Sequence, residues 1–243
     1  MDKLRFEKRN KNKIKLMSTD ISLKKLSKKW ISDSYHYEYS YHFNWLGLPI
    51  IQYPQDIIAL QEIIWKIKPD LIIETGVARG GSVVFLASLL EIIGNGEVIG
   101  IDIKIHKQNR KAIEKHHMFK RITLIEDSSI NEESIKKVKQ LSKNKKCVMI
   151  ILDSNHTHEH VLSELKAYSS LITKGSYLVV FDTLVEDLPE KFFKDRPWTK
   201  KKNPKSAVYQ FLKTTNRFKI DKNITDKLLI TAAPDGYLKC IRK

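Results

Sequence analysis

The sequence predicts an α/β fold of the Rossmann-like kind: a doubly wound, mostly parallel sheet of seven strands with helices on both faces and an antiparallel hairpin at the C-terminal end. From residue 71 onward, short apolar runs alternate with amphipathic stretches, which is the pattern of strands joined by crossover helices. The runs are continuously apolar, as in strands buried on both faces. The last two, residues 228–232 and 237–241, flank Pro234-Asp-Gly236 and leave no room for a helix, so they predict the hairpin.

The individual elements follow from periodicity and from helix stop signals such as Gly94-Asn-Gly96. Parallel strands are expected at residues 71–74, 98–102, 122–126, 148–153 and 177–182. Helices are expected at residues 82–93, 110–117, 131–142, 157–170 and 205–214, and an amphipathic helix at 56–67 leads into the first strand. We therefore expect one Rossmann-like domain over residues 56–243.

Residues 1–55 divide into a basic arm and an aromatic-rich cover segment. The arm, residues 1–29, is rich in lysine and lacks the apolar centre of a secretory signal, so we expect a partly helical, solvated segment. The cover segment, residues 30–55, contains Trp30, Tyr35, Tyr37, Tyr39, Tyr41, Phe43 and Trp45. Its aromatic rings fit two roles equally well: stacking on a pyranose, or packing as a hydrophobic cover on the sheet.

The chain is strongly basic, with 44 Lys and Arg against 28 Asp and Glu and a formal net charge of +16. Such a surface attracts nucleic acid, anionic lipid or an anionic substrate. The lysines are spread along the chain, which favours a generally solvated surface, and only residues 8–15 and 200–205 form clusters. We expect no nucleic-acid partner, and peripheral membrane contact through the arm stays open.

Localisation and assembly are predicted from the same composition. No apolar run reaches the roughly 20 residues of a membrane span. Cys147 stands at the start of the predicted strand 148–153 and Cys240 falls in the last predicted strand, which suits free thiols in a reducing compartment. We expect a cytoplasmic protein, with the inner face of the membrane as an alternative, and a homo-oligomer.

The strongest local motif is the glycine loop Glu74-Thr-Gly-Val-Ala-Arg-Gly-Gly-Ser82, between a strand and a helix. Gly76 permits a tight turn, Gly80 and Gly81 permit close approach of a ligand, and the helix that begins at Ser82 offers free N–H groups. The spacing matches neither a dinucleotide fingerprint nor a phosphate-binding Walker loop. Glu74 ends the strand before the loop and favours a cation, such as the amino and sulfonium groups of S-adenosylmethionine, over a pyrophosphate.

Two further carboxylates suit the rest of that cofactor. Asp102 ends the second strand, where a carboxylate accepts hydrogen bonds from ribose hydroxyls; the alternative is a turn or helix-capping role. Asp127 follows the third strand, where the adenine amino group would lie, and capping of the helix from Asn131 is an equal alternative. The predicted cofactor-binding residues are Glu74, Gly76, Gly80, Gly81, Ser82, Asp102 and Asp127.

Carboxylates also follow the fourth and fifth strands. Asp153 and Asp182 should converge at the carboxyl edge of the sheet, and two carboxylates suit Mg²⁺ better than zinc. We predict both as metal ligands, with Glu186 and Asp187 as alternative acids. Asp153 and His156 are the predicted catalytic residues, His156 being the general base or a substrate contact.

His158 stands two residues after His156, a spacing that does not place both rings on one helical face, so we predict a structural role for it. The reaction would be in-line methyl transfer from sulfonium to an oxygen nucleophile, for which the enzyme aligns the partners and helps to remove the hydroxyl proton.

These residues resemble a known family. Residues 45–56, 72–82 and 152–161, together with Phe181-Asp-Thr183, are similar to the cephalosporin hydroxylase/rhamnosyl O-methyltransferase family over most of the chain from about Trp30. The resemblance implies a class I methyltransferase domain that binds S-adenosylmethionine at Glu74, Gly76, Gly80 and Asp102. Members are associated with antibiotic tailoring and with O-methylation of sugars on glycolipids.

The resemblance also implies a Mg²⁺ site built from a carboxylate after the fourth strand and an acidic pair after the fifth. Asp153 matches the first position and Asp182 the second residue of the pair. Phe181 stands where the first acid of the pair would be. This departure predicts a weaker metal site, one completed by Glu186 or Asp187, or none.

We therefore expect an S-adenosylmethionine-dependent O-methyltransferase, assisted by Mg²⁺, that acts on a hydroxyl of a sugar, glycolipid or small natural product. A non-catalytic ligand-binding protein on the same scaffold is the alternative that Phe181 favours. A nucleic-acid-modifying methyltransferase is a further alternative, supported only by the net charge. An oxygenase is suggested only by the family name, because the sequence offers no 2-His-1-carboxylate arrangement at a suitable spacing.

Overall fold

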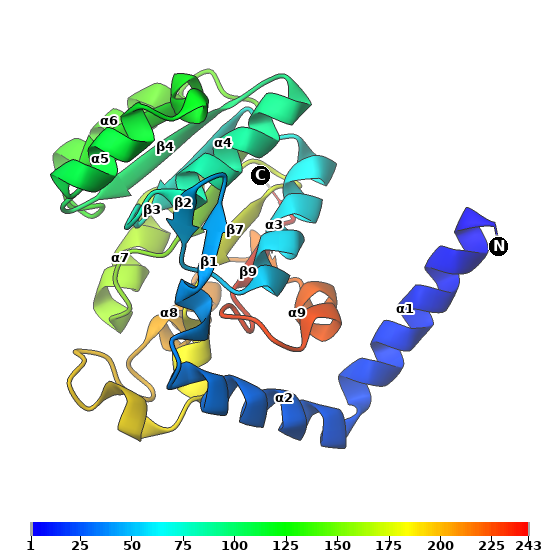
Figure 1. Cartoon of the computed structure of the whole chain (residues 1–243). Helices are drawn as coiled ribbons and strands as arrows, with labels where there is room; N and C mark the ends of the chain where they lie inside the picture. Colours follow the sequence, from blue (N-terminus) through cyan, green and yellow to red (C-terminus); the bar gives the residue numbers. More distant parts are fainter. Residues whose placement is uncertain (1, 243) are drawn as a thin grey trace.

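The computed structural model describes residues 2–242 and has a seven-stranded sheet at its centre (Figure 1). The strand order is β5-β4-β3-β6-β7-β9-β8. Strands β3 to β7 pair in parallel, whereas β9 is antiparallel to both β7 and β8. The strands are β3 (Leu71–Thr75), β4 (Glu97–Asp102), β5 (Ile122–Glu126), β6 (Val148–Leu152), β7 (Tyr177–Val180), β8 (Phe218–Ile220) and β9 (Tyr237–Cys240). The order reverses between β3 and β6, which is where a doubly wound sheet opens a ligand crevice.

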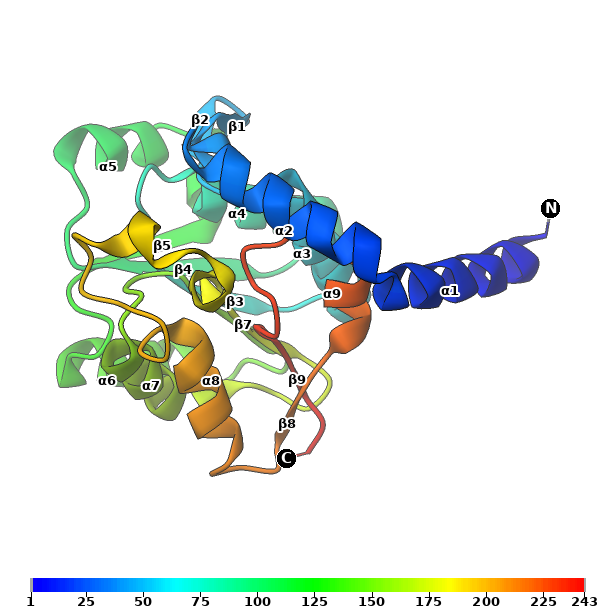
Figure 2. The ribbon, with the colours of Figure 1, turned by 90° about the horizontal axis from the view of Figure 1, so that it is seen from below.

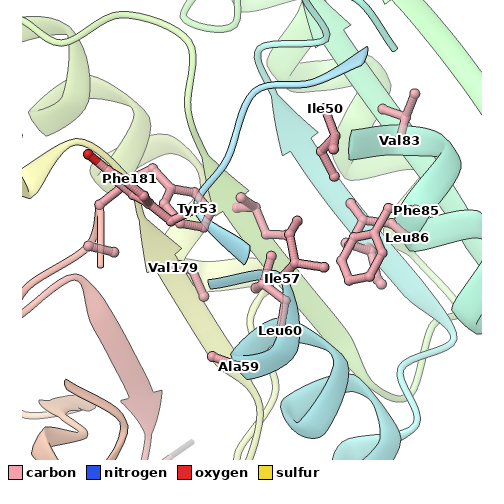
Figure 3. Packing of buried hydrophobic residues seen from close by; sticks show 14 of the residues in the cluster. Ile50, Tyr53, Ile57, Ala59, Leu60, Val83, Phe85, Leu86, Val179 and Phe181 are labelled. Carbon is pink, nitrogen blue, oxygen red and sulfur yellow. The ribbon is translucent and has the colours of Figure 1, made fainter. Parts of the chain in front are cut away.

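Helices cover both faces of the sheet because successive residues of each strand point to opposite faces. On β3, Ile72 belongs to one apolar core, whereas Leu71 and Ile73 belong to the other. Figure 3 shows the first core, where residues of α3 and α4 pack together. Helices α6, α7 and α8 supply the second core. The helices of the domain are α3 (Pro54–Ile67), α4 (Gly81–Ile93), α5 (Lys107–Glu114), α6 (Glu132–Ser142), α7 (His158–Tyr168), α8 (Pro204–Leu212) and α9 (Lys222–Leu228).

The five parallel strands lie where the sequence predicts them. Of the two strands predicted for the C-terminal hairpin, 237–241 is confirmed and 228–232 is wrong. Residues 228–232 form no strand: α9 ends at Leu228, and Leu229 takes a positive φ of 59°. Residues 218–220 form β8 instead and pair with β9. The apolar run after Leu228 is buried for another reason, because Thr231 and Ala232 bind a buried carboxylate of α3.

That carboxylate belongs to Asp56, which is fully buried. Its Oδ1 accepts hydrogen bonds from the hydroxyls of Thr231 (2.5 Å) and Tyr237 (2.6 Å), and its Oδ2 accepts one from the backbone N–H of Ala232 (2.7 Å). Burial raises the pKa of Asp56 to about 6, although these hydrogen bonds oppose the shift. One side chain thus ties α3 to the segment before β9.

The N-terminal region consists of two helices, a 3₁₀ turn and a small hairpin: α1 (Lys3–Thr19), α2 (Ile21–Tyr35), η1 (Tyr39–Tyr41), β1 (Phe43–Trp45) and β2 (Leu48–Ile50). Trp45 anchors the hairpin on α4, because its Nε1 donates to Ser88 Oγ at 3.0 Å and its ring lies 4.8 Å from that of Phe85. The expected cover segment therefore packs on the sheet domain. Helix α1 projects away from the body (Figures 1 and 2). No helix within residues 2–242 combines the length and the apolar character needed to cross a bilayer.

The buried Asp56 gives a testable pH dependence. Its folded-state pKa of about 6 lies above the unfolded value of about 3.9, so the protonated form is favoured by folding. The resulting stabilisation is complete below the unfolded pKa and is lost as the pH rises through the folded pKa. We expect the unfolding free energy of the wild type to fall, relative to that of Asp56→Asn, by about 2 kcal/mol between about pH 4 and pH 6.

The measurement is urea unfolding of both proteins at a series of pH values, in which other titrating groups cancel in the difference. Two parallel stability curves would show that Asp56 does not change its ionisation on folding.

Candidate active site

The glycine loop joins β3 to α4 and is packed tightly between two other segments. Gly76 has a φ of +93°, and a Cβ there would lie 2.1 Å from the carbonyl oxygen of Asp153. A Cβ at Gly81 would lie 2.3 Å from the carbonyl oxygen of Pro49, and one at Gly80 would lie 2.4 Å from the Ile113 side chain. The structure therefore explains all three glycines by close protein packing, and a ligand contact at Gly80 and Gly81 stays a prediction.

Asp102 holds this loop in place. Its Oδ2 accepts hydrogen bonds from the backbone N–H groups of Val77 (2.9 Å) and Ala78 (3.0 Å), and its Oδ1 accepts one from Lys104 N–H (3.1 Å). Ala78 lies in the left-handed region with a φ of 46°, which the two hydrogen bonds help to maintain. The same carboxylate lines a small cavity of about 100 Å³ beside Gly76, so its predicted ribose contact is sterically available.

Asp127 is held by hydrogen bonds at the turn that precedes α6. Its carboxylate accepts hydrogen bonds from Ser134 Oγ (2.7 Å), Asn131 Nδ2 (2.9 Å) and the backbone N–H of Ser128 (2.7 Å). These hydrogen bonds lower the pKa of Asp127. Asp127 is absent from the lining of the small cavity, to which its neighbours Ser128 and Ser129 contribute. Asn131 rather than Asp127 caps α6, because its Oδ1 accepts a hydrogen bond from the backbone N–H of Glu133 (3.3 Å), and the adenine contact of Asp127 stays a prediction.

Glu74 is buried at the end of β3 with 3% of its surface exposed. Burial raises its pKa to about 8, Asp102 adds to the shift, and the hydrogen bond that Ser82 Oγ donates at 2.8 Å opposes it. None of the ion pairs among residues 2–242 involves Glu74. A cation bound beside it would restore the charged form.

Asp153, His156 and Asp182 meet at the carboxyl edge of the sheet, as predicted. Asp153 directly follows β6, and Asp182 lies two residues beyond β7 with a positive φ of 52°. The Nε2 of His156 lies 2.9 Å from Asp182 Oδ2 and 3.9 Å from Asp153 Oδ1. One ligand atom from each residue falls within 4.8 Å of the others, which is close enough to share one cation.

The three groups do not ionise alike. Burial raises the pKa of Asp153 well above its usual range, and the nearby Asp182 and Glu74 carboxylates add to the shift. Burial also opposes the charged forms of Asp182 and His156, but their mutual attraction and hydrogen bond outweigh it. The pKa of Asp182 is therefore lowered and that of His156 is raised. The pairing thus favours the charged form of Asp182 and protonation of His156, whereas the surroundings of Asp153 favour its neutral form.

Gln52 completes the cluster and was not predicted from the sequence. Its Nε2 donates to Asp153 Oδ2 at 3.0 Å, and only 6% of its surface is exposed. Its Oε1 is buried with no hydrogen-bond partner among the described residues. Gln52 and Asp153 are 101 positions apart, so local periodicity carries no signal of the contact. The resembling segment 45–56 includes Gln52 but gives it no role.

Other predicted residues lie outside the cluster. His158 contacts Ser206 Oγ (2.7 Å) and Gln210 Oε1 (2.8 Å) on α8, as expected for a structural role. Glu186 accepts hydrogen bonds from the backbone N–H of Lys201 and the side chain of Asn203, and Asp187 pairs with Lys28 and Lys205. Neither alternative acid therefore joins Asp153 and Asp182.

Phe181, at the position where the resemblance implies an acid, turns into the protein interior. It is 3% exposed and belongs to the core cluster that also contains Tyr53 (Figure 3). Its ring lies 6.5 Å from that of Tyr237 in an edge-on arrangement. The side chain is accommodated as a core residue, and no described acid takes its place in the cluster.

A cavity of about 300 Å³ opens over the cluster. Its floor includes Gly76, Ser82, Asp153 and His156, and it shares Gly76 and Ser154 with the smaller cavity beside Asp102. The walls come from the cover segment and from the loop after β7, and the polar and aromatic wall residues are Tyr35, Tyr41, Tyr53, Arg196 and Trp198. Trp198 packs 4.8 Å from the ring of His156. Trp198 and Arg196 were not singled out from the sequence, because one aromatic residue in a basic loop has no distinctive pattern.

The parallel sheet that ends in an antiparallel strand, with a glycine loop after β3 and carboxylates at the strand ends, is the fold of class I methyltransferases. The model of the family described as Rhamnosyl O-methyltransferase/CmcI matches residues 37–241, and the chain belongs to this family. A rhamnosyl O-methyltransferase from Mycobacterium leprae is 33% identical over 168 residues, covering 65% of this chain and 70% of the relative. One from Mycobacterium tuberculosis is 28% identical over 218 residues, covering 86% and 84%.

Solved structures share the fold. A structure of CmcI with Mg and SAM superposes with a TM-score of 0.58 at 18% identity, covering 83% of this chain and 78% of that one. MycE from the mycinamycin biosynthetic pathway, in complex with Mg and SAH, gives a TM-score of 0.52 at 15% identity, covering 87% and 55%. A Klebsiella pneumoniae protein described as an O-methyltransferase gives 0.52 at 12% identity, covering 79% and 80%.

The Asp182–His156 pair can be tested in the protein without any bound ligand. Because the attraction of Asp182 raises the pKa of His156 against the effect of burial, Asp182→Asn should lower that pKa. The pKa is measured by titrating the imidazole resonances by NMR. His158, which contacts Ser206 and Gln210 instead, serves as the internal control. An unchanged His156 titration would contradict the pairing.

Proposed function

We propose that this protein is an S-adenosylmethionine-dependent O-methyltransferase that methylates a hydroxyl group of a sugar or of a sugar-bearing natural product. The observation that carries the proposal is the single pocket in which the glycine loop and the Asp153–His156–Asp182 cluster lie side by side. A methyl donor on the loop would then face an acceptor hydroxyl at the cluster. Family membership and the names of the mycobacterial relatives support this chemistry.

The pocket suits a cationic donor. Gln52, whose buried Oε1 has no partner, lines the pocket, and so does Ser82, which binds the buried Glu74. A buried unpaired acceptor costs about 1–3 kcal/mol. The ammonium and sulfonium groups of S-adenosylmethionine would offset that cost. We propose that its ribose lies against Asp102 in the adjoining cavity, which joins the main pocket at Gly76 and Ser154.

A divalent cation fits the same cluster. Asp153 and Asp182 bring two carboxylates together, an arrangement that a cation or a shared proton must neutralise, and oxygen ligands suit Mg²⁺. When bound, the ion would lower the pKa of an acceptor hydroxyl that it contacts. Because Phe181 contributes no ligand, we expect weaker Mg²⁺ binding than a third carboxylate would give.

The chain's own residues align the acceptor and remove its proton. His156 is the proposed base: its neutral imidazole takes the hydroxyl proton through the ring nitrogen that does not contact Asp182, and Asp182, which contacts Nε2, stabilises the imidazolium that forms. Gln52 fixes the orientation of Asp153 through its hydrogen bond to Oδ2. Trp198 and Tyr41 line the pocket beside His156, and aromatic faces of this kind fit the apolar face of a pyranose. A homo-oligomeric assembly stays a prediction.

Binding of S-adenosylhomocysteine, measured by calorimetry, tests the cofactor site. We expect Asp102→Ala to weaken binding about 10- to 100-fold, because it removes the proposed ribose contact and the support of the loop. Lys174→Ala, a change remote from the loop, should bind like the wild type. A second titration with Mg²⁺ present should tighten binding if the ion completes the site. Absence of binding to the wild type in every condition would remove the methyltransferase proposal and leave a ligand-binding protein on the same scaffold.

Loss of the proposed base should affect turnover and spare cofactor affinity. We expect His156→Ala to lower kcat for transfer to a rhamnosyl acceptor about 10²- to 10⁴-fold, while the Kd for S-adenosylhomocysteine changes little. His106→Ala, at an exposed histidine that caps α5 only through its backbone, is the matched control. Equal rates for the two variants would exclude His156 as the base.

A further inference from the structure

Helix α1 is an addition that the proposed function does not use. The family match begins at residue 37, so α1 and α2 both precede the region that the family model matches. Helix α1 spans 17 residues, contains no buried residue and extends from the body beyond the elbow at Asp20 (Figure 2). A helix of this length and composition has little stability by itself in water, so its surface needs a partner.

One stripe of α1 is already covered. Asn10, Ile14, Met17 and Ser18 are its partly buried positions, and their spacing of four, seven and eight residues from Asn10 places them on one helical face. This stripe packs against α9 of the sheet domain. The covered stripe fixes which way the helix faces and leaves the opposite side to solvent.

The solvent side is strongly basic. Helix α1 carries seven basic residues and a single acidic one, Glu7, and none of the seven forms an ion pair with a carboxylate of residues 2–242. The basic residues are Lys3, Arg5, Lys8, Arg9, Lys11, Lys13 and Lys15. Clusters of four to eight such residues on a helix are attracted to anionic lipid headgroups.

Large apolar side chains lie among these cations. Leu4 is 75% exposed and Leu16 is 63% exposed, and Ile21, just past the elbow, is 71% exposed. Phe6 is also exposed and lies under the guanidinium of Arg9, 5.6 Å from its ring centre. Such side chains insert below the headgroups of a bilayer while lysines remain at the phosphates.

We propose that α1 binds the surface of an anionic phospholipid membrane and holds the methyltransferase domain beside it. Charge complementarity selects this partner over a second copy, because pairing two α1 helices would bring like charges together. The exposed leucines select it over nucleic acid, whose phosphates would satisfy the lysines and leave the apolar side chains in water. The contact is peripheral, consistent with the lack of a membrane-spanning helix among the described residues.

The test is co-sedimentation of the full chain with vesicles of phosphatidylcholine alone or with added phosphatidylglycerol. We expect binding only to the anionic vesicles, weakening as salt is added. Reversing three outward charges (Lys8→Glu, Lys11→Glu, Lys15→Glu) should lower the partition coefficient at least 100-fold, since each cation near an anionic surface contributes about a fivefold factor. The matched control reverses Lys136, Lys137 and Lys139 on α6, which lies on the far side of the molecule from α1 (Figures 1 and 2).

Replacing the exposed leucines distinguishes a membrane partner from nucleic acid and from a second copy of the chain. Leu4→Ser with Leu16→Ser should weaken vesicle binding about tenfold or more without changing affinity for duplex DNA. The proposal is overturned if the two charge-reversed proteins sediment alike, or if the leucine variant binds vesicles like the wild type. It is also overturned if that variant changes only the oligomeric state without lipid, because α1 would then face a second copy. Binding of S-adenosylhomocysteine should be equal in all variants and shows that the domain is folded.

Discussion

The contact between Gly76 and the backbone of Asp153 is the constraint on which the site depends. The first residue after β3 must turn while its Cα lies against the carbonyl that follows β6, and a side chain of any size would occupy the space of that carbonyl oxygen. Backbone hydrogen bonds between strands continue up to the turn. The N–H of Gly76 donates to the carbonyl oxygen of Ile101 (2.8 Å), and the N–H of Asp153 donates to that of Thr75 (2.9 Å). The same contact therefore brings the loop held by Asp102 within reach of His156.

A surplus of carboxyl groups defines the electrostatics around the pocket. Asp153 and Asp182 line the crevice, the buried Glu74 lies close enough to raise the pKa of Asp153, and His156 pairs directly with Asp182. Two of these acids respond by raised pKa values and the third by pairing. A site of this kind is costly without ligands and is relieved by cations. Arg79 and Arg196 also line the crevice but form no ion pair with its carboxylates, so the net charge of the chain gives no guide to the chemistry of the site.

Sequence reasoning recovers the parts of this molecule that depend on local patterns. The continuous apolar runs locate β3 to β7, and the rule that parallel strands end at one edge brings Asp153 and Asp182 together before any coordinates exist. It fails where a distant contact overrides a local signal. Residues 228–232 have the apolar pattern of a strand, but the segment is held by hydrogen bonds to Asp56, which is 176 positions from Ala232, and does not pair with the sheet. Gln52 is hidden for the same reason. Asp127 has two locally plausible roles, adenine binding and helix capping, but in the structure it binds the side chains of Ser134 and Asn131, a contact that no local pattern predicts.

The hydrogen bonds that Asp56 forms with Thr231 and Ala232 affect the order in which the chain can fold while it is being translated. Ala232 lines the pocket, and its partner on α3 leaves the ribosome long before it does. The loop and its supporting aspartate come from β3 and β4, so the cofactor half can assemble while the chain is still growing. The wall that contains Ala232 cannot form until the segment after α9 has been synthesised and β9 has entered the sheet between β7 and β8. The pocket is thereby completed by elements that come late in the order of the chain.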